Sequence, residues 1–586
     1  MLRRKRWEIQ ASVPATGALG PPLFPPELAQ ILRNRGVTTS EEADRFLRME
    51  PPAQCDPLRL TGVRAAVDRI LRSLKLGEKI AIYGDYDTDG VTATALLVCY
   101  LRSRGAVAFP YIPSRLDEGY GLNPGALRML KQEEYGLVIT VDCGIRSLEE
   151  AQQARQMGLD LVITDHHEPL AELPDALAVI DPKIPGDSYP DKGLAGAGVA
   201  YKLAQAVEAH LVQGQTNAGA NLEEYLELVA VGTVADLAPL VEENRFLVGS
   251  GLAGLNAASG PRNLGLRKLM EDASLRPGQV TAGSIGFVLG PRLNSAGRVE
   301  HAMSSYDLLV TESPEVATEL AARLSAWNRQ RQQITRTVTS RARDQVLSLR
   351  EGETGGGLPF FVFASDPSYH PGVIGLAASR LSEEFYRPVA VVAVDLQSGL
   401  ARGSARSIPE FELIRAFDQC KELLLQHGGH AAAAGFTARV EALPALQARL
   451  EALARAELAP RALEPRLKAD VVVHLPKLQE LASWLKRLEP CGQGNPQPVF
   501  VTPRVQVVSK RAVGGNGSHL MLRLGEGNAT LDAIAFGRGP DVSRLPDEVA
   551  VAFRLEEDEF AGVRRLRLNV LDLGEPDPGE LLPAAG

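Results

Sequence analysis

The chain has 586 residues, of which 45% are hydrophobic and 23% charged, and its formal net charge is −9. This length exceeds one ordinary hydrophobic core, so several domains are expected. The negative charge argues against indiscriminate binding of polyanions, and no apolar run approaches the roughly 18 residues that cross a bilayer. The five cysteines form no CxxC pair, which argues against a disulfide framework or a cysteine-based zinc site. We therefore expect a cytoplasmic protein without a secretory signal.

The first 262 residues divide into two parts. Residues 1–60 combine proline-rich turns with helical patterns near 25–33 and 40–47, and we interpret them as an N-terminal appendage. Between residues 61 and 262, helical stretches separate four continuous apolar runs, at 80–83, 137–141, 161–164 and 176–180. Continuous runs are typical of strands that are buried on both faces, so this segment predicts a parallel α/β sheet.

The rest of the chain predicts a linker and two further domains. Residues 263–352 are expected to form a helical linker that ends in one long helix, 315–349, with Ser313 as its N-cap. A glycine-rich break leads to a smaller α/β domain at 353–460, with strands near 360–364 and 389–394. Short Val-, Leu- and Phe-rich segments at 461–575 predict a small β-barrel, and residues 576–586 a disordered tail.

The segment Asp85-Tyr-Asp87-Thr-Asp89-Gly90 directly follows the first predicted strand. Three carboxylates in five residues repel one another unless a cation neutralises them, although a solvated turn is the simpler alternative. An EF-hand loop begins with the same spacing, but it needs a bidentate glutamate at its twelfth position, where this chain has Leu96. We therefore reject the EF-hand.

Three more motifs carry possible metal ligands. Asp142 ends the second predicted strand, and His166 and His167 follow the third. Asp236 lies in an apolar segment, where an uncompensated carboxylate would be costly to bury. Each motif alone has a structural explanation, such as a helix cap or a packed histidine pair. Together they place oxygen ligands and an imidazole at the carboxyl edge of one sheet, which favours Mn²⁺ or Mg²⁺ over structural zinc.

The segments DYDTDG, VDCG, TDHH and VADLAPL resemble the four motifs of the DHH phosphoesterase superfamily, and within it the RecJ family. The resemblance covers about residues 60–575. Further matching segments lie at 117–122, 289–294, 296–298, 370–375, 403–407, 427–435 and 492–496. The resemblance implies a DHH domain, a DHHA1 domain that covers the cleft, and a C-terminal OB fold.

The resemblance also implies roles for single residues. Asp142 would bridge two metal ions. The remaining ligands would be Asp89, His166 and Asp236 for one ion and Asp85 and Asp87 for the other. The implied catalytic residues are Asp142, His166, His167 and Arg292. Many members of the superfamily carry a histidine near the start of the first motif, where this chain has Tyr83-Gly-Asp85, so the role of Asp85 is left open.

Single-stranded DNA is the implied substrate. Arg115 is the candidate for the terminal 5′ phosphate, and Arg292 and Arg298 are candidates for holding a phosphate, although each arginine could instead form an ordinary surface ion pair. The other implied DNA contacts are Tyr120, Asn294, Asn328, Arg329, Arg331, His370, Ser404, Arg406 and His430. The small residues 431–434 would let backbone approach the substrate closely, or they could reflect tight helix packing.

Arginines are concentrated in residues 321–350, where seven of them stand against one acid, Asp344. A solvated helix face normally carries interleaved glutamates for pairing, and this stretch lacks them. We therefore predict a helix that follows the phosphate backbone, with Trp327 as a stacking ring, over the alternative of a solvated face.

The implied function is a 5′-to-3′ exonuclease that hydrolyses single-stranded DNA to 5′-mononucleotides by a two-metal mechanism, in DNA recombination and in mismatch and base-excision repair. The implied partners are a single-strand-binding protein and a RecQ-type helicase, with no membrane and a monomeric chain. One alternative is a DHH phosphoesterase of short oligonucleotides or cyclic dinucleotides, but such relatives lack the third domain. The other is a non-catalytic scaffold, but such relatives lose metal ligands that are present here.

Overall fold

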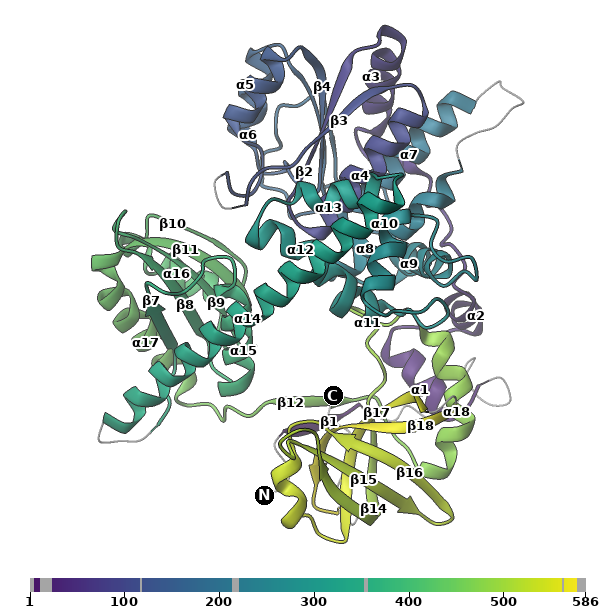
Figure 1. Ribbon diagram of the computed structural model, residues 1–586, viewed down its shortest axis with the longest axis vertical. Helices are drawn as coiled ribbons and strands as arrows, with labels where there is room; N and C mark the ends of the chain where they lie inside the picture. Colours follow the sequence, from purple (N-terminus) through teal and green to yellow (C-terminus); the bar gives the residue numbers. More distant parts are fainter. Residues whose placement is uncertain are drawn as a thin grey trace. The chain divides into compact units, whose positions relative to one another are not determined.

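The computed structural model describes residues 5–10, 24–115, 118–212, 221–352, 357–560 and 563–576 (Figure 1). The chain forms two compact units. The first comprises Met1–Asn294, Ala302–Ala322 and Arg466–Gly586, and the second comprises Ser295–His301 and Arg323–Pro465. Almost all of the predicted disordered tail lies outside the described residues.

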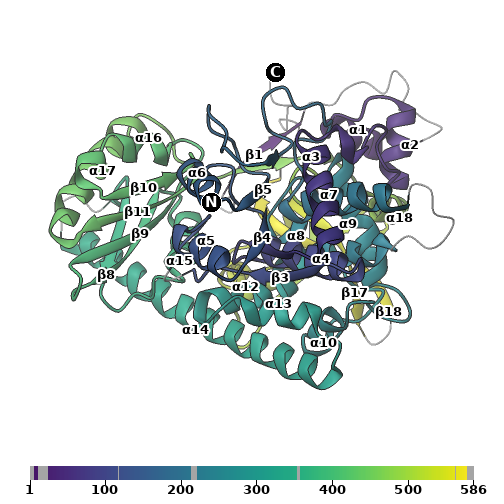
Figure 2. The same cartoon turned by 90° about the horizontal axis from the view of Figure 1, so that it is seen from above.

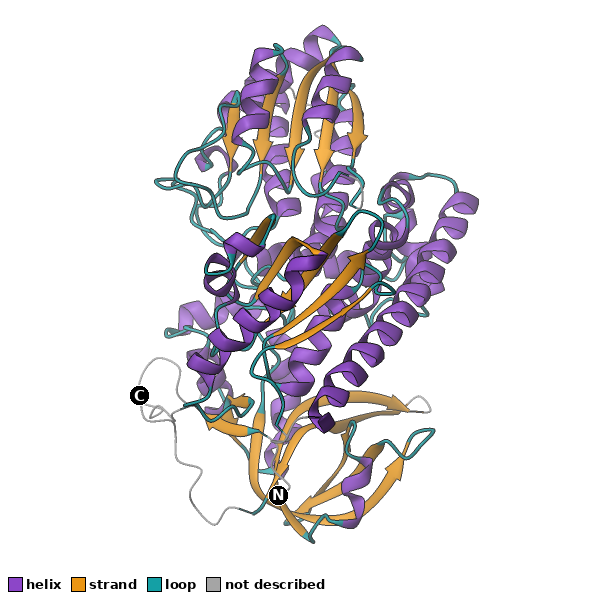
Figure 3. Ribbon diagram, turned by 90° about the vertical axis from the view of Figure 1, so that its left-hand side faces the viewer, coloured by secondary structure: helices purple, strands orange, loops and turns teal. Residues whose placement is uncertain are grey.

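A five-stranded parallel sheet lies at the centre of the predicted catalytic domain, and its strands point in one direction in Figure 3. The strand order is β3 (Val107–Tyr111), β2 (Lys79–Gly84), β4 (Tyr135–Val141), β5 (Asp160–Thr164) and β6 (Ala178–Ile180). All four predicted strands are present. The edge strand β3 has no predicted counterpart, because Pro110 lies within it and proline is tolerated only at such an edge.

Helices follow the strands of this sheet and continue beyond it. Helix α3 (Val63–Leu76) precedes the first strand, and α4 (Thr88–Ser103), α5 (Pro124–Gln132) and α6 (Leu148–Gln156) lie between strands. Those after the sheet are α7 (Gly196–Val212), α8 (Leu226–Ala235), α9 (Glu242–Leu255), α10 (Leu264–Asp272), α11 (Ala282–Ser284), α12 (Gly290–Val299) and α13 (Met303–Val310). A π-helix, Ile285–Leu289, directly precedes α12.

The predicted long helix is α14 (Pro314–Gly352), whose length is evident in Figure 2. The Ser313 hydroxyl accepts a hydrogen bond from the Val316 backbone N–H at 3.3 Å, so Ser313 caps the first turn as predicted. No helix in the described part of the chain is both long enough and apolar enough to cross a lipid bilayer.

The second unit contains a five-stranded mixed sheet in the order β10-β11-β9-β8-β7. Its strands are β7 (Val362–Asp366), β8 (Val389–Asp395), β9 (Leu400–Arg406), β10 (Gln426–Gly429) and β11 (Ala433–Arg439). Its helices are α15 (Ile374–Phe385), α16 (Leu413–Asp418) and α17 (Leu443–Leu458). Strand β7 begins two residues later than predicted. Helix packing is the wrong explanation for residues 431–434, because they form a turn and the start of β11.

The C-terminal segment forms the predicted barrel. Its sheet contains β13 (Val471–Val472), β14 (Phe500–Val513), β15 (His519–Glu526), β16 (Ala529–Ala535), β17 (Glu548–Phe560) and β18 (Val563–Gly574). Pairing of β14 with β17 as well as with β15 closes the barrel. Helix α18 (Leu478–Leu485) lies in the connection that precedes β14.

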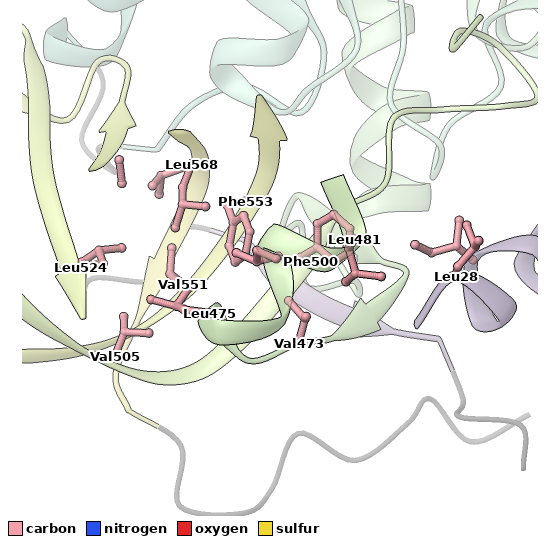
Figure 4. Close-up of a cluster of buried hydrophobic side chains, with 14 of the residues drawn as sticks. Leu28, Val473, Leu475, Leu481, Phe500, Val505, Leu524, Val551, Phe553 and Leu568 are labelled. Carbon is pink, nitrogen blue, oxygen red and sulfur yellow. The ribbon is translucent and has the colours of Figure 1, made fainter. Parts of the chain in front are cut away.

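The N-terminal segment shares its hydrophobic core with this barrel. Strand β1 (Arg6–Ile9) pairs in parallel with β12 (Arg466–Ala469), and helices α1 (Pro26–Asn34) and α2 (Ser40–Arg48) follow. Leu28 of α1 belongs to the same buried cluster as Leu481 of α18 and Phe553 of β17 (Figure 4). The two ends of the chain therefore bury apolar surface together, which no local pattern in residues 1–60 indicates.

Candidate active site

The predicted ligands gather at the carboxyl edge of the parallel sheet. Asp85 follows β2, Asp142 follows β4, and His166 follows β5. Because parallel strands end at a common edge, these three side chains are brought together by topology alone. Asp236 reaches the same place from another direction, since it is the C-cap residue of α8.

Among the described residues, three groups of side chains have the spacing of metal ligands: one is Asp142, Asp165, His166 and His167, and the other two contain the six predicted ligands. Possible ligand atoms of Asp85, Asp87 and Asp142 lie within 4.8 Å of one another, and so do those of Asp89, His166 and Asp236. The two groups meet where His166 Nε2 lies 3.0 Å from Asp142 Oδ1. The structure thus brings together all six predicted ligands, with Asp142 at the junction between the two groups.

Two helix N-termini organise the first motif. The Asp87 carboxylate caps α4 by accepting hydrogen bonds from the backbone N–H groups of Asp89 and Gly90. The Asp89 carboxylate in turn accepts from the N–H groups of Gly196 and Ala197, at 2.7 and 2.9 Å, where α7 begins. Helix N-termini favour negative charge, so both carboxylates are held in defined orientations before any cation binds.

Close packing at the cluster requires two glycines that the sequence did not single out. A Cβ atom on Gly196 would lie 2.6 Å from the Asp142 Cβ atom, and one on Gly232 would lie 2.5 Å from Asp89 Oδ1. Asp142 itself has a backbone φ of 62°, which is uncommon for a residue other than glycine. Strained backbone of this kind is often found at functional sites.

Asp165 is a further residue that sequence reasoning missed. It lies between Thr164 and His166 in the third motif and is fully buried. Its carboxylate accepts hydrogen bonds from the N–H groups of Ile145, His166 and His167, and one oxygen lies 2.7 Å from Nδ1 of His167. Asp165 therefore orients His167. Its position in the motif was the available signal.

The buried carboxylates of the cluster repel one another, and a bound cation would relieve this repulsion. Burial, followed by the charge of Asp87, raises the pKa of Asp85 to about 8 and that of Asp236 to about 7. Burial and neighbouring carboxylates also raise the pKa of Asp89 and of Asp142 well above the usual range.

Histidine ionisation fits the same requirement. Burial lowers the pKa of His166 to about 3, which leaves the imidazole neutral, as a metal ligand must be. Burial also acts to lower the pKa of His167, but the hydrogen bond and charge of Asp165 outweigh it and raise the value to about 9. Asp85 Oδ1 is buried without a hydrogen-bond partner. A pair of divalent cations would satisfy that oxygen and offset the repulsion, so the residues present fit Mn²⁺ or Mg²⁺.

Four predicted substrate residues lie in the first unit, and three of them contact residues of the first or third motif. The Tyr120 hydroxyl lies 3.1 Å from His167 Nδ1, and the Arg115 guanidinium lies 4.9 Å from the centre of the Tyr86 ring. Asn294 Oδ1 accepts a hydrogen bond from the Thr88 N–H, so this side chain supports the start of α4. Arg292 donates to the backbone oxygen of Val288, one turn earlier in the chain.

Another four predicted residues meet in the second unit, around the turn that leads into α15. Arg406 Nη1 lies 3.2 Å from the Ser404 hydroxyl, and Arg298 Nη1 donates to the Gly372 carbonyl at 3.0 Å. His370 Nδ1 accepts from the Gly372 N–H. A Cβ atom on Gly375 would lie within 3.2 Å of both Ser404 and Arg406, so the cluster approaches the helix backbone closely. His430 is exposed in the turn between β10 and β11.

The arginines of α14 differ in their surroundings. Arg329 is exposed, whereas Arg331 is half-buried and donates to Asn328 Oδ1 at 2.8 Å. Asn328 has only 3% of its surface exposed, so it holds Arg331 rather than presenting a side chain to solvent. Arg341 donates to Ser368, and Arg343 forms an ion pair with Glu384.

Comparison with known proteins places this geometry in a family. Three family models match: the DHH family N-terminal domain at residues 79–233, the DHHA1 domain at 357–456 and the RecJ OB domain at 469–572. The single-stranded-DNA-specific exonuclease RecJ of Salmonella typhimurium is 34% identical over 98% of this chain and 98% of its own length. The RecJ exonuclease of Bacillus subtilis is 37% identical, and that match covers 92% of this chain. The chain spans 66% of the length of the Bacillus subtilis protein.

A solved structure agrees with these matches. The crystal structure of RecJ in complex with Mn²⁺ from Thermus thermophilus has a TM-score of 0.80 and 32% identity, and the match covers 99% of this chain and 80% of that one. The three domain matches lie in the order that the sequence predicts. The chain therefore belongs to the RecJ family.

Proposed function

We propose that the chain is a metal-dependent exonuclease that degrades single-stranded DNA from the 5′ end to 5′-mononucleotides, with two Mn²⁺ or Mg²⁺ ions at the Asp142 cluster. The observation that carries the proposal is the junction of the two ligand groups through Asp142 and His166. The curated relatives named RecJ are described as specific for single-stranded DNA, and similar crystal structures are described with Mn²⁺ and with Mg²⁺.

The six ligands would hold the ions, Asp142 contributing to both. When bound, such ions cancel charge on phosphate oxygens and make water a better nucleophile. Hydrolysis adds one water across the P–O3′ bond behind the first nucleotide, and the 3′ oxygen leaves with a proton. The shortened strand keeps the phosphate as a new 5′ end, so every cycle presents the same group for recognition.

His167 is the residue that would contact the scissile phosphate. Asp165 engages its Nδ1 atom, so Nε2 is the nitrogen that would donate a hydrogen bond to a phosphate oxygen. The Tyr120 hydroxyl also contacts Nδ1, which further restricts the ring. His167 and its two partners therefore act by orienting the substrate.

Residues of both units are proposed to bind the DNA strand through its phosphates. Arg115, beside Tyr86 in the first unit, is proposed to contact the terminal 5′ phosphate. Arg298, His370, Ser404 and Arg406 in the second unit offer donors at the start of α15, where a helix N-terminus also favours anions. Arg292 and Asn294 complete the proposed contacts around the metal cluster, and Arg329, Arg331 and His430 extend them.

The proposed setting is cytoplasmic DNA recombination and repair, including end resection, mismatch repair and base-excision repair. A nuclease confined to single strands needs a source of them. A RecQ-type helicase and a single-strand-binding protein are therefore the proposed partners of a monomeric enzyme.

The proposal is tested with one oligonucleotide labelled at either end, incubated with Mn²⁺ and with an EDTA control. A 5′ label should appear at once in mononucleotides, while a 3′ label should stay in strands that shorten gradually. Early release of the 3′ label as mononucleotide would contradict the polarity. Cleavage of dinucleotides alone, with long strands untouched, would favour the short-oligonucleotide alternative.

A further inference from the structure

The metal ligand Asp236 lies in the turn that ends helix α8. Helix α8 ends there, with hydrogen bonds from the Asp236 N–H to the Gly232 carbonyl and from the Ala238 N–H to the Thr233 carbonyl. Leu237 adopts a left-handed φ of 63° although 73% of its surface is exposed. A left-handed conformation costs a residue with a side chain about 1–2 kcal/mol. The Leu237 N–H also donates to the Val234 carbonyl, so the turn's own hydrogen bonds offset part of this cost. Contacts to the residues that follow the turn add to its support.

The GQGN loop, defined as residues 487–496 between α18 and β14, packs against the residues that follow this turn. The Leu240 N–H donates to the Gln493 carbonyl at 2.7 Å. A Cβ atom on Gly492 would lie 2.7 Å from Leu240 Cδ1, and one on Gly494 would lie 3.3 Å from both Pro239 and Val241. The loop thus contacts the three residues that follow the turn, so a side chain at Gly492 would displace Leu240 and one at Gly494 would press on Pro239 and Val241.

Asn495 closes the loop from within. Its side-chain Nδ2 donates to the carbonyls of Leu488 and Pro490, each at 2.8 Å. Its backbone forms a bridge with Gly492, whose N–H donates to the Asn495 carbonyl at 2.8 Å. Asn495 is fully buried, so the loop is held in one conformation by its own polar groups.

Arg245 joins the loop to the catalytic domain. This α9 residue is 3% exposed, and its guanidinium donates to the carbonyls of four consecutive residues, Arg487, Leu488, Glu489 and Pro490, at 2.8–3.2 Å. A fifth bond reaches the Phe46 carbonyl at the end of α2. A buried guanidinium that serves five carbonyls is a rigid link, because loss of any partner leaves a charged donor unsatisfied.

We propose that the GQGN loop, clamped by Arg245 and Asn495, positions Asp236 for metal binding by holding the backbone of residues 239–241. The inference rests on the proposed function, because it takes Asp236 as a metal ligand. It makes Gly492, Gly494, Asn495 and Arg245 positioning residues. The connection that leads into the barrel thereby supports the metal centre as well as the barrel itself.

The test compares two glycine substitutions in the full-length chain. Gly494→Ala adds a methyl group against Pro239 and Val241 at a φ of +73°. Gly527→Ala is the matched control, because its φ of +59° imposes a similar backbone penalty while its Cβ atom would meet nothing within 4 Å. A thermal unfolding transition is first recorded for each variant, to check that both variants fold. Mn²⁺ affinity is then measured without DNA, by the loss of the free-ion signal in electron paramagnetic resonance.

Gly494→Ala should weaken binding of one Mn²⁺ by about tenfold, the lower end of the range for groups that support a metal ligand, while Gly527→Ala keeps wild-type affinity. Equal affinities in the two variants, whether both wild-type or both reduced, would overturn the proposal. Should Gly494→Ala fail to fold, Gly492→Ala is compared directly with the wild-type chain, because Gly492 has no left-handed φ and its Cβ atom would press on Leu240. The proposed function fails separately, if Asp236→Ala binds Mn²⁺ as tightly as the wild-type chain.

Discussion

The edge of the parallel sheet and the helix α14 both carry clusters of charge, but only the first brings its predicted residues to one point. Asp85, Asp142 and His166 follow different strands that must end at the same edge, so they converge. Residues along a helix project in different directions, and α14 accordingly leaves Arg329 exposed while it half-buries Arg331. Position relative to strand ends therefore predicts a site, whereas a count of charges along a helix does not show which of them are available.

The largest expected effect tests whether the residues at the edge of the parallel sheet catalyse hydrolysis. Asp142→Ala should lower kcat by about a thousandfold or more, because removal of one member of an interdependent set disables the whole. Single-turnover cleavage of a 5′-labelled strand in saturating Mn²⁺ measures the loss, and circular dichroism confirms the fold. Turnover near the wild-type rate would remove Asp142 from the chemistry.

The shared core of the two chain ends gives the next largest effect. Leu28→Ala should lower the free energy of unfolding by about 2–5 kcal/mol, because Leu28 is fully buried in the barrel cluster. Leu76→Ala, at a leucine of α3 that is 58% exposed, is the matched control and should change stability little. Denaturant titration measures both variants. Equal free energies of unfolding for Leu28→Ala and Leu76→Ala would show that residues 1–60 are an independent appendage.

Arg115 sharpens the comparison within the first unit. Arg115→Ala should reduce the preference for 5′-phosphorylated over 5′-hydroxyl strands by about tenfold, the value of one charge-assisted hydrogen bond. The ratio of kcat/KM for the two substrates is the measurement. An unchanged ratio would assign the 5′ phosphate to other donors, with the second-unit cluster around Ser404 and Arg406 as the next candidate.

Arg329 and Arg331 of α14 give the smallest effect, and they separate DNA binding from structural support. Arg329→Ala should flatten the salt dependence of DNA binding by about 0.7 in log–log slope, the value for one lost contact to a single strand. Arg331→Ala should lower thermal stability as well, because it leaves the buried Asn328 without its partner. If Arg329→Ala and the wild-type chain show equal salt dependence of DNA binding, the arginines of this helix form a solvated face and not a DNA contact.

Local pattern was sufficient to predict the parallel sheet, the barrel and the long helix, because each depends on residues near one another in sequence. The rule for strand ends and the family resemblance together predicted that the six candidate ligands lie close to one another. Gly196 and Gly232 were not predicted, since their roles appear only when α7 and α8 pack against the first and second motifs. Asp165 was missed although its place in the third motif was a signal. The burial of Leu28 with Phe553 depends on contacts between opposite ends of the chain, which periodicity does not record.

The stoichiometry of Mn²⁺ binding tests the central claim, a two-ion site at the sheet edge, most directly. Equilibrium titration of the full-length chain, followed by electron paramagnetic resonance without DNA, counts the ions. We expect two bound Mn²⁺ per wild-type chain and weakened binding of both in Asp142→Ala, since Asp142 joins the two ligand groups. Two ions bound by Asp142→Ala with wild-type affinity would contradict the account.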